Sequence, residues 1–307
     1  MKRNITLFAL ILVSLICVLC ACGNKSGFTY TKVEGGIAIT GYTGENMDMV
    51  IPTEINGKKV VEIASKAFDT ALIKTAVIPE TVTKIGTYAF RRCPNLVSIE
   101  IKGNIKEISD GMFNFCPLLK EITIPDGVER IGNNAFGGGS ITSIDLPDSV
   151  KSIDDYAFYS CKSLTSFKAG KNLESIGNNS FAGCIALKDI SLNQNLKEIG
   201  EYAFSYCTAI ESIHFPESVK TLSMGVLSGT NITEMYVSNG VTTIDAFAFS
   251  VCEKLEKIYI PENVKDINYE AFKDTKKITI YGVSDSEAEI FADTYGYKFQ
   301  KYDFSVN

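Results

Sequence analysis

Apolar residues recur along this chain with a period of 22 or 23 residues. Aligning the periods on one position gives a column of nine phenylalanines and one leucine: Phe68, Phe90, Phe113, Phe136, Phe158, Phe181, Phe204, Leu227, Phe249 and Phe272. An Ile or Leu lies five residues before each member, and a Val, Ile or Leu lies eight residues before it. A fixed period in this range predicts a solenoid, in which each turn of chain, or coil, buries its apolar side only against its neighbours. About ten such coils cover residues 51–281.

Each coil also contains a pair of aliphatic residues separated by one other residue, such as Ile99 and Ile101. This alternation predicts a short strand with one face inward, so stacked coils would form a parallel sheet. Around the aromatic residue we expect a short helical segment. We also expect a left-handed or tight turn four residues before it, because that position is often Gly, Asp or Asn, as at Gly86 and Gly132.

Composition narrows the function classes. The chain has 307 residues, of which 45% are hydrophobic, enough for a sizeable core. The net charge of −6 and the lack of a Lys/Arg cluster argue against nucleic-acid binding. The sequence contains one histidine, His214, and no nucleophile elbow, phosphate-binding loop or zinc-type histidine spacing. It therefore predicts neither an enzyme nor a cofactor or metal site.

The N-terminus has the layout of a secretory signal, with Lys2 and Arg3 followed by an apolar run at residues 5–19 that is short for a membrane span. The run ends in Leu19-Cys20-Ala21-Cys22, which resembles a bacterial lipobox. The resemblance implies removal of residues 1–21 and acylation of Cys22 by chains such as palmitate, which would anchor the protein to a membrane. Residues 22–27 would then be a short tether, since residues 23–27 reach at most about 18 Å. The alternative is an ordinary signal peptide in which Cys22 is incidental.

Six cysteines stand three residues after an aromatic residue: Cys93, Cys116, Cys161, Cys184, Cys207 and Cys252. Equivalent atoms of neighbouring coils lie about 4.8 Å apart, which is within the Cα range for a disulfide but beyond the preferred Cβ range. Only Cys93–Cys116 and one pair among Cys161, Cys184 and Cys207 could form. We favour free, buried cysteines that pack as small hydrophobic residues, and we predict no disulfide.

Residues 79–101, PETVTKIGTYAFRRCPNLVSIEI, resemble the BspA-like leucine-rich repeats of bacterial surface proteins. The resemblance implies an α/β right-handed leucine-rich-repeat solenoid, with a β-hairpin cap at residues 28–50 and a helix and strand cap at residues 282–307. Within the second cap, Ser286 can cap a short helix that carries Ala288, Ile290, Phe291 and Ala292. Members of the family are described as adhesins or as binders of host or neighbouring-cell proteins.

Ligand-binding residues should lie at outward positions, because the inward ones are committed to packing. The residue between the paired aliphatic residues is expected to face outward, and it reads Val77, Glu100, Thr123, Asp145, Lys168, Ser191, His214, Tyr236, Tyr259 and Thr279. His214, Tyr236 and Tyr259 are consecutive in this column, and Tyr281 lies near its end. These four form our candidate site for a protein, or possibly a glycan, ligand. The alternative is that tyrosine simply suits an exposed strand.

The sequence thus predicts an exported, lipid-anchored protein on the outer face of the cell membrane that binds other proteins through its sheet face. The alternative is a structural scaffold of the cell envelope that binds the cell's own components. The short tether favours this alternative, since it holds the folded part close to the membrane.

Overall fold

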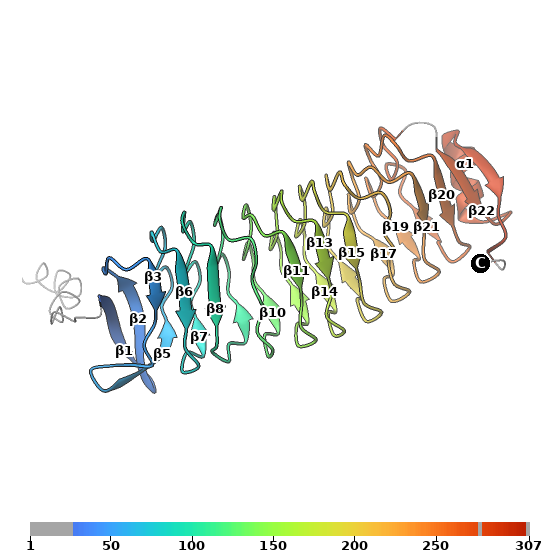
Figure 1. Cartoon of the computed structure of the whole chain (residues 1–307). Coiled ribbons are helices and arrows are strands. Elements are labelled where there is room, and N and C mark those ends of the chain that lie inside the picture. The colour runs from blue at the N-terminus through green and yellow to red at the C-terminus, as the bar shows by residue number, and fades with distance from the viewer. Residues whose placement is uncertain (1–26, 276–277, 305–307) are drawn as a thin grey trace, which may run out of the picture.

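The structure, a computed structural model, describes residues 27–275 and 278–304. The predicted signal peptide, Cys22 and residues 23–26 of the tether lie outside this part. The described chain forms one elongated stack of coils with a hairpin at one end and a helix at the other, which confirms the predicted solenoid (Figure 1). No helix in the described part of the chain is both long and apolar enough to cross a membrane. Each coil is named below by its member of the aromatic column.

One side of the stack carries the longer strands, and we call it the long-strand face. Its strands are β3 (Asp48–Val50), β6 (Thr75–Ile78), β8 (Ser98–Ile101), β11 (Ser143–Asp145), β13 (Ser166–Lys168), β15 (Asp189–Ser191), β18 (Glu234–Tyr236), β20 (Lys257–Ile260), β22 (Thr279–Gly282) and β23 (Lys298–Lys301). They pair in parallel within three sheets, β3-β6-β8, β11-β13-β15 and β18-β20-β22-β23. Residues 121–125 and 211–215, at the equivalent place in two coils between these sheets, form no strand. The face is therefore interrupted twice, unlike the continuous sheet that the pattern predicts.

A second side carries mostly two-residue strands, and we call it the short-strand face. Its strands are β5 (Lys58–Ile63), β7 (Lys84–Ile85), β9 (Glu107–Ile108), β10 (Arg130–Ile131), β12 (Ser152–Ile153), β14 (Ser175–Ile176), β16 (Glu198–Ile199), β17 (Thr221–Leu222), β19 (Thr243–Ile244) and β21 (Asp266–Ile267). Pairing lapses between β7 and β9 and again between β16 and β17. Each strand ends at the inward Ile or Leu five residues before the aromatic residue. This second set of strands is not predicted by the sequence analysis.

Neighbouring coils are also joined through the turns that run from two residues before to two residues after each member of the aromatic column. We call this side of the stack the turn edge, and its hydrogen bonds are unbroken from the Phe68 coil to the Phe272 coil. From Phe68 to Phe249, the amide of each aromatic-column residue donates to a carbonyl of the next coil, as from Phe90 to Met112 (3.0 Å) and from Phe204 to Val226 (3.0 Å). The chain here is a series of turns, so the expectation of a short helical segment is wrong. Because the turn edge continues through both interruptions, the stack survives where strand pairing lapses.

The expected left-handed backbone four residues before the aromatic residue is also wrong. The left-handed residues lie two before and two after it, as at Tyr88 (φ 59°) and Arg92 (φ 54°). Glycine is nevertheless favoured four residues before the aromatic residue, because neighbouring coils approach closely there. A Cβ atom on Gly86 would lie 2.4 Å from the Ser65 amide nitrogen.

The core consists of the columns that the sequence predicts. Every member of the aromatic column is at most 2% exposed. The phenylalanine rings stack along the solenoid axis, with ring centroids 5.0 Å apart for Phe68–Phe90 and 5.3 Å apart for Phe181–Phe204. Each coil therefore covers an apolar surface of the next, and this contact provides most of the stability of a solenoid.

The six repeat cysteines are free, buried thiols. Each donates a weak hydrogen bond to the carbonyl of the aromatic-column residue in the preceding coil, as from Cys93 to Phe68 (3.1 Å) and from Cys207 to Phe181 (3.0 Å). Burial raises the pKa of Cys161 to about 12 and also raises the pKa of Cys184 and Cys252. These thiols therefore stay protonated, which suits a packing role.

Both ends of the solenoid are covered. At the N-terminal end, β1 (Phe28–Val33) and β2 (Gly36–Tyr42) form an antiparallel hairpin that extends the β5 sheet, and β4 (Glu54–Ile55) pairs with β5. At the other end, α1 (Glu287–Tyr295) places Phe291 against Phe272, with ring centroids 5.8 Å apart. Ser286 is the N-cap residue, but its hydroxyl makes no capping bond. Of the four apolar residues predicted on this helix, Ala288, Phe291 and Ala292 are buried and Ile290 is exposed.

Candidate ligand-binding surface

Three of the four candidate residues lie in one row on the long-strand face. The register pairs Tyr236 with Tyr259 and Tyr259 with Tyr281 across β18, β20 and β22. Their rings stack with centroids 4.2 Å apart for Tyr236–Tyr259 and 4.6 Å apart for Tyr259–Tyr281. We call this row the tyrosine stack. Each ring of the stack therefore packs against at least one other ring, which restricts its rotamers.

The register corrects one residue of the predicted outward column. Thr279 pairs with Lys257, so the partner of Tyr259 is Tyr281. The sequence carried this information, since the spacing from Tyr259 to Tyr281 is 22 residues and the spacing to Thr279 is only 20.

Exposure within the tyrosine stack is uneven. Tyr236 is 41% exposed, whereas Tyr259, which we expected to face solvent, is only 6% exposed. Tyr259 is buried because its ring lies between two others and because Tyr302 packs on it edge-to-face at 4.7 Å. The Tyr302 amide also donates to the Gly282 carbonyl (2.7 Å), which holds the C-terminal segment against the stack. Tyr236 is therefore the ring of the stack that is most accessible to a ligand.

Charged residues border the exposed end of the tyrosine stack. Glu234 lies 3.6 Å from the Lys257 ammonium and accepts a hydrogen bond from the Tyr236 hydroxyl (3.4 Å). Burial, together with Glu234 and Tyr236, raises the pKa of Tyr259 above its usual range. The Tyr259 hydroxyl thus stays protonated. The surface offers one aromatic ring with a carboxylate and an ammonium beside it, which is chemistry suited to a protein surface.

His214 does not join the tyrosine stack. It belongs to residues 211–215, the segment that forms no strand, and the sheet of the tyrosines begins one coil later at β18. The exposed His214 lines a separate open groove of about 540 Å³, together with Asp189, Gln194 and Ser212. The candidate residues thus comprise three in one sheet and His214 in the adjacent coil, whose equivalent segment forms no strand.

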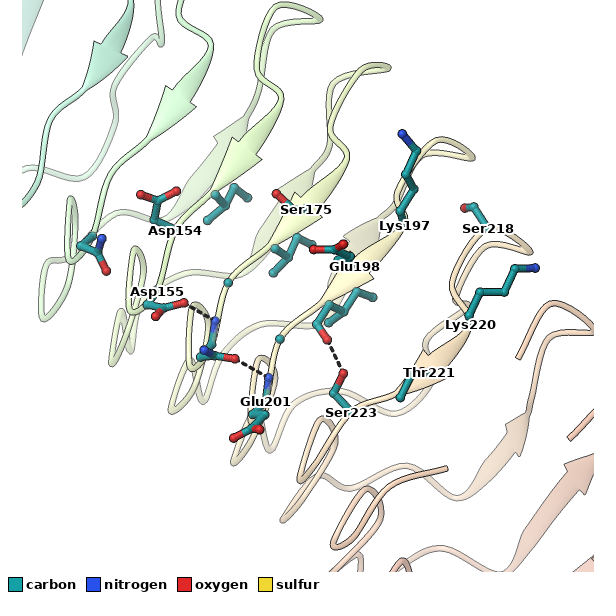
Figure 2. A pocket seen from close by; sticks show the side chains of 17 residues that line it. Asp154, Asp155, Ser175, Lys197, Glu198, Glu201, Ser218, Lys220, Thr221 and Ser223 are labelled. Atoms are coloured by element: carbon teal, nitrogen blue, oxygen red, sulfur yellow. Dashed lines mark hydrogen bonds between the residues drawn. The ribbon is translucent and has the colours of Figure 1, made fainter. Parts of the chain in front are cut away.

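A second groove, of about 940 Å³, lies on the short-strand face and was missed by the sequence analysis. Figure 2 shows Asp154, Asp155, Ser175, Lys197, Glu198 and Lys220 around it. Small residues line part of the groove, including Ser175, Gly177 and Gly200. Asp155 accepts a hydrogen bond from the Asn178 amide (2.7 Å), and Asn178 in turn accepts one from the Glu201 amide (2.7 Å). Its polar groups thus partly serve to join neighbouring coils.

The described residues contain no group of three or more His, Cys, Asp or Glu side chains arranged to hold a metal ion.

Comparison with known proteins agrees with the fold. Residues 51–165 and 151–279 match the family model described as the BspA type leucine rich repeat region (6 copies). A leucine-rich repeat protein from Bacteroides ovatus is 30% identical, with a TM-score of 0.75, over 83% of this chain and 70% of that one. A leucine rich cell surface protein from Faecalibacterium prausnitzii is 23% identical, with a TM-score of 0.44, over 86% and 95% of the two chains.

The pneumococcal vaccine antigen PcpA is 18% identical, with a TM-score of 0.45, over 90% of this chain and 96% of that one. None of the curated proteins matches this sequence. The family model covers well over half of the chain, and the two matched ranges lie over the coils described above. The chain therefore belongs to the BspA-type leucine-rich repeat family.

Proposed function

We propose that this protein is an exported, lipid-anchored surface protein that binds a protein ligand through the tyrosine stack on its long-strand face. The observation that carries the proposal is the exposed Tyr236 ring, held in place by Tyr259 and flanked by Glu234 and Lys257. A ring that is already ordered loses little conformational entropy on binding, and tyrosine is frequent among the residues that dominate protein interfaces.

Replacing Tyr236 with alanine tests the binding surface directly. We expect Tyr236→Ala to weaken binding by at least tenfold, the effect of removing one energetically dominant interface residue. Tyr269→Ala is the matched control, because Tyr269 is also exposed but lies outside the tyrosine stack. Binding is measured by surface plasmon resonance against purified extracellular-matrix glycoproteins and against detergent extracts of cell envelopes.

Tyr236 is preferable to Tyr259 for this test because Tyr259 is buried, so its replacement would also disturb the fold. Circular dichroism establishes that both variants remain folded. The proposal fails if no protein in either panel is bound. It also fails if the Tyr236→Ala and Tyr269→Ala variants bind equally well.

The proposed anchor rests on the Leu19-Cys20-Ala21-Cys22 tetrad and needs its own test. We expect labelled palmitate to be incorporated into the protein in bacteria, and Cys22→Ala to abolish the label and release the protein from membranes. Protease treatment of intact cells then addresses exposure. Digestion of the solenoid supports a surface role, whereas digestion only after wall removal supports the alternative of an envelope scaffold.

A further inference from the structure

The contact between the Phe204 coil and the Leu227 coil, which we call the second junction, lacks strand pairing on both faces. On the short-strand face, β16 ends one sheet and β17 begins the next. On the long-strand face, residues 211–215 lie between β15 and β18, and the described structure records no backbone hydrogen bond for them. An ordinary contact, such as that between the Phe158 and Phe181 coils, has strand pairing on both faces.

The core is also weaker at the second junction. Phe204 stacks on Phe181, but Leu227 follows it, and ring stacking resumes only between Phe249 and Phe272 (5.5 Å). Thr230 occupies the cysteine position, and its hydroxyl donates to the Leu227 carbonyl of its own coil (2.8 Å). Neither a ring pair nor a hydrogen bond from the cysteine position therefore crosses this junction.

One groove of the solenoid lies at the second junction, and the other lies one contact before it. The groove on the short-strand face is lined by Glu198 on one side of the junction and by Thr221 and Ser223 on the other, as Figure 2 shows. The groove on the long-strand face lies between β15 of the Phe181 coil and residues 212–216 of the Phe204 coil, one contact before the junction. Solvent thus reaches the space beside the weakened contact from the short-strand face.

The turn edge still joins the two coils. Backbone hydrogen bonds connect Tyr202 to Met224 (2.8 Å) and Tyr206 to Ser228 (2.7 Å). The Tyr202 ring lies against Gly225, where an added Cβ would be only 2.2 Å from a ring carbon. Away from this edge, the Ser218 and Ser223 hydroxyls and the Asn231 side-chain amide donate hydrogen bonds across the junction to carbonyls of the preceding coil.

We propose that the second junction is a hinge, so that the coils before it and the coils after it swing relative to each other about the turn edge. The stability of a repeat protein is approximately a sum of contacts between neighbouring coils, so the weakest contact opens first. The C-terminal unit carries the tyrosine stack, and the N-terminal unit carries the hairpin that follows the predicted tether. Opening therefore changes the angle of the tyrosine stack to the rest of the long-strand face without unfolding either unit.

A buried thiol placed beside the junction reports its opening. Val219 and Val150 occupy the equivalent position eight residues before the aromatic column, and they are 1% and 0% exposed. Val219 lies at the second junction, whereas Val150 lies among coils with paired strands. Val→Cys is nearly isosteric, and the native thiols are buried, so a mass-tagged maleimide distinguishes the new cysteine by its position in the sequence.

In the full chain, we expect Val219→Cys to react at least tenfold faster than Val150→Cys under native conditions, with only a shallow dependence on urea. Hinge opening exposes little surface, whereas unfolding exposes much and gives a steep dependence. We expect Leu227→Phe, which restores the missing ring, to slow the reaction at residue 219 by about threefold to tenfold and to leave residue 150 unchanged.

Equal rates at residues 219 and 150 would overturn the hinge, as would a steep urea dependence at residue 219. If Val219→Cys does not fold, Leu196→Cys and Leu173→Cys repeat the comparison from the other side of the junction. If Leu227→Phe does not fold, the difference between the two sites and its urea dependence still decide the matter.

Discussion

Strand pairing lapses at two junctions of this solenoid, and the two differ in what remains. The first junction joins the Phe90 coil to the Phe113 coil. There, β7 and β9 are unpaired on the short-strand face, and residues 121–125 form no strand on the long-strand face. The second junction has the same lapse on both faces. In each case the turn edge and a serine hydroxyl bridge the coils, with Ser109 bonded to the Gly86 carbonyl and Ser223 bonded to the Ile199 carbonyl.

The cores of the two junctions are different. At the first junction, Phe90 and Phe113 stack at 5.9 Å, and Cys116 donates to the Phe90 carbonyl (3.1 Å). At the second junction, Leu227 and Thr230 replace the ring and the thiol, and both interactions are lost. We therefore expect a lapse in strand pairing to create no hinge where the core stack continues. A hinge requires the core contact to weaken at the same place.

Removing the ring at the first junction should have the largest effect, because it takes away the core contact that distinguishes this junction from the second. We expect Phe113→Ala to lower the free energy of unfolding by about 3–5 kcal/mol, because the fully buried ring leaves a cavity. Phe158→Ala is the control, since it removes the same ring between coils whose strands are paired. Urea denaturation measures both losses.

Only Phe113→Ala should also create a second hinge. A thiol at Ile105, eight residues before Phe113, would then become reactive below the urea concentrations that unfold the protein. If Ile105→Cys stays unreactive in the Phe113→Ala background, core stacking does not decide which junction opens.

Removing the serine hydroxyls that bridge the junctions should have a smaller effect. Ser223→Ala removes one of the hydroxyl bonds across the second junction, and we expect this to lower its opening free energy by about 1 kcal/mol. The reaction of Val219→Cys would then be about fivefold faster, since 1.4 kcal/mol corresponds to a factor of ten.

Ser109→Ala is the matched change at the first junction. It should cost a similar amount in global stability and produce no local opening, because the stacked rings still hold that junction closed. Faster thiol reaction at Ile105→Cys in the Ser109→Ala background would contradict this expectation.

The core of the fold was predictable from the sequence because its information repeats. Every inward position recurs with a fixed spacing, so an error at one coil is corrected by the others. The two-residue strands were missed because Ser175–Ile176 and its equivalents are too short to show alternation. The left-handed positions were missed because they are occupied by residues such as Tyr88 and Arg92, on which the packing of neighbouring coils imposes the conformation.

The candidate site was predicted less well, because it depends on features that occur once. The row formed by Tyr236 and Tyr259 follows from the repeat spacing. The cover supplied by Tyr302 does not, since Tyr302 comes from the C-terminal segment beyond the repeats. The missing strand at the segment of His214 does not follow from the repeat spacing, and no single residue indicates it. Leu227 and Thr230 were visible as exceptions to their columns, but only the structure shows that they coincide with the lapse in strand pairing.

Changing one surface charge at the second junction should have the smallest effect on its opening. Seven residues before the aromatic column, charges alternate along the short-strand face, and Lys151 pairs with Glu129 (2.7 Å) and Lys197 with Glu174 (2.8 Å). Lys197 accordingly holds the pKa of Glu174 below its usual range. At the second junction the alternation fails, because Lys220 follows Lys197, and its ammonium donates to the Glu217 carbonyl (3.1 Å).

Lys220→Glu would restore the alternation by placing a carboxylate beside Lys197. We expect a gain of about 0.2–1 kcal/mol in the opening free energy of the junction, as for other exposed ion pairs. Val219→Cys should then react up to about fivefold more slowly at low ionic strength, and the difference should vanish near 1 M salt, where the Debye length is about 3 Å. Lys265→Glu is the matched control, since Lys265 makes the same contact with the Glu262 carbonyl but has Thr242 in the preceding coil. An equal slowing by both changes, or a slowing that persists in high salt, would show that the restored charge pair is not the cause.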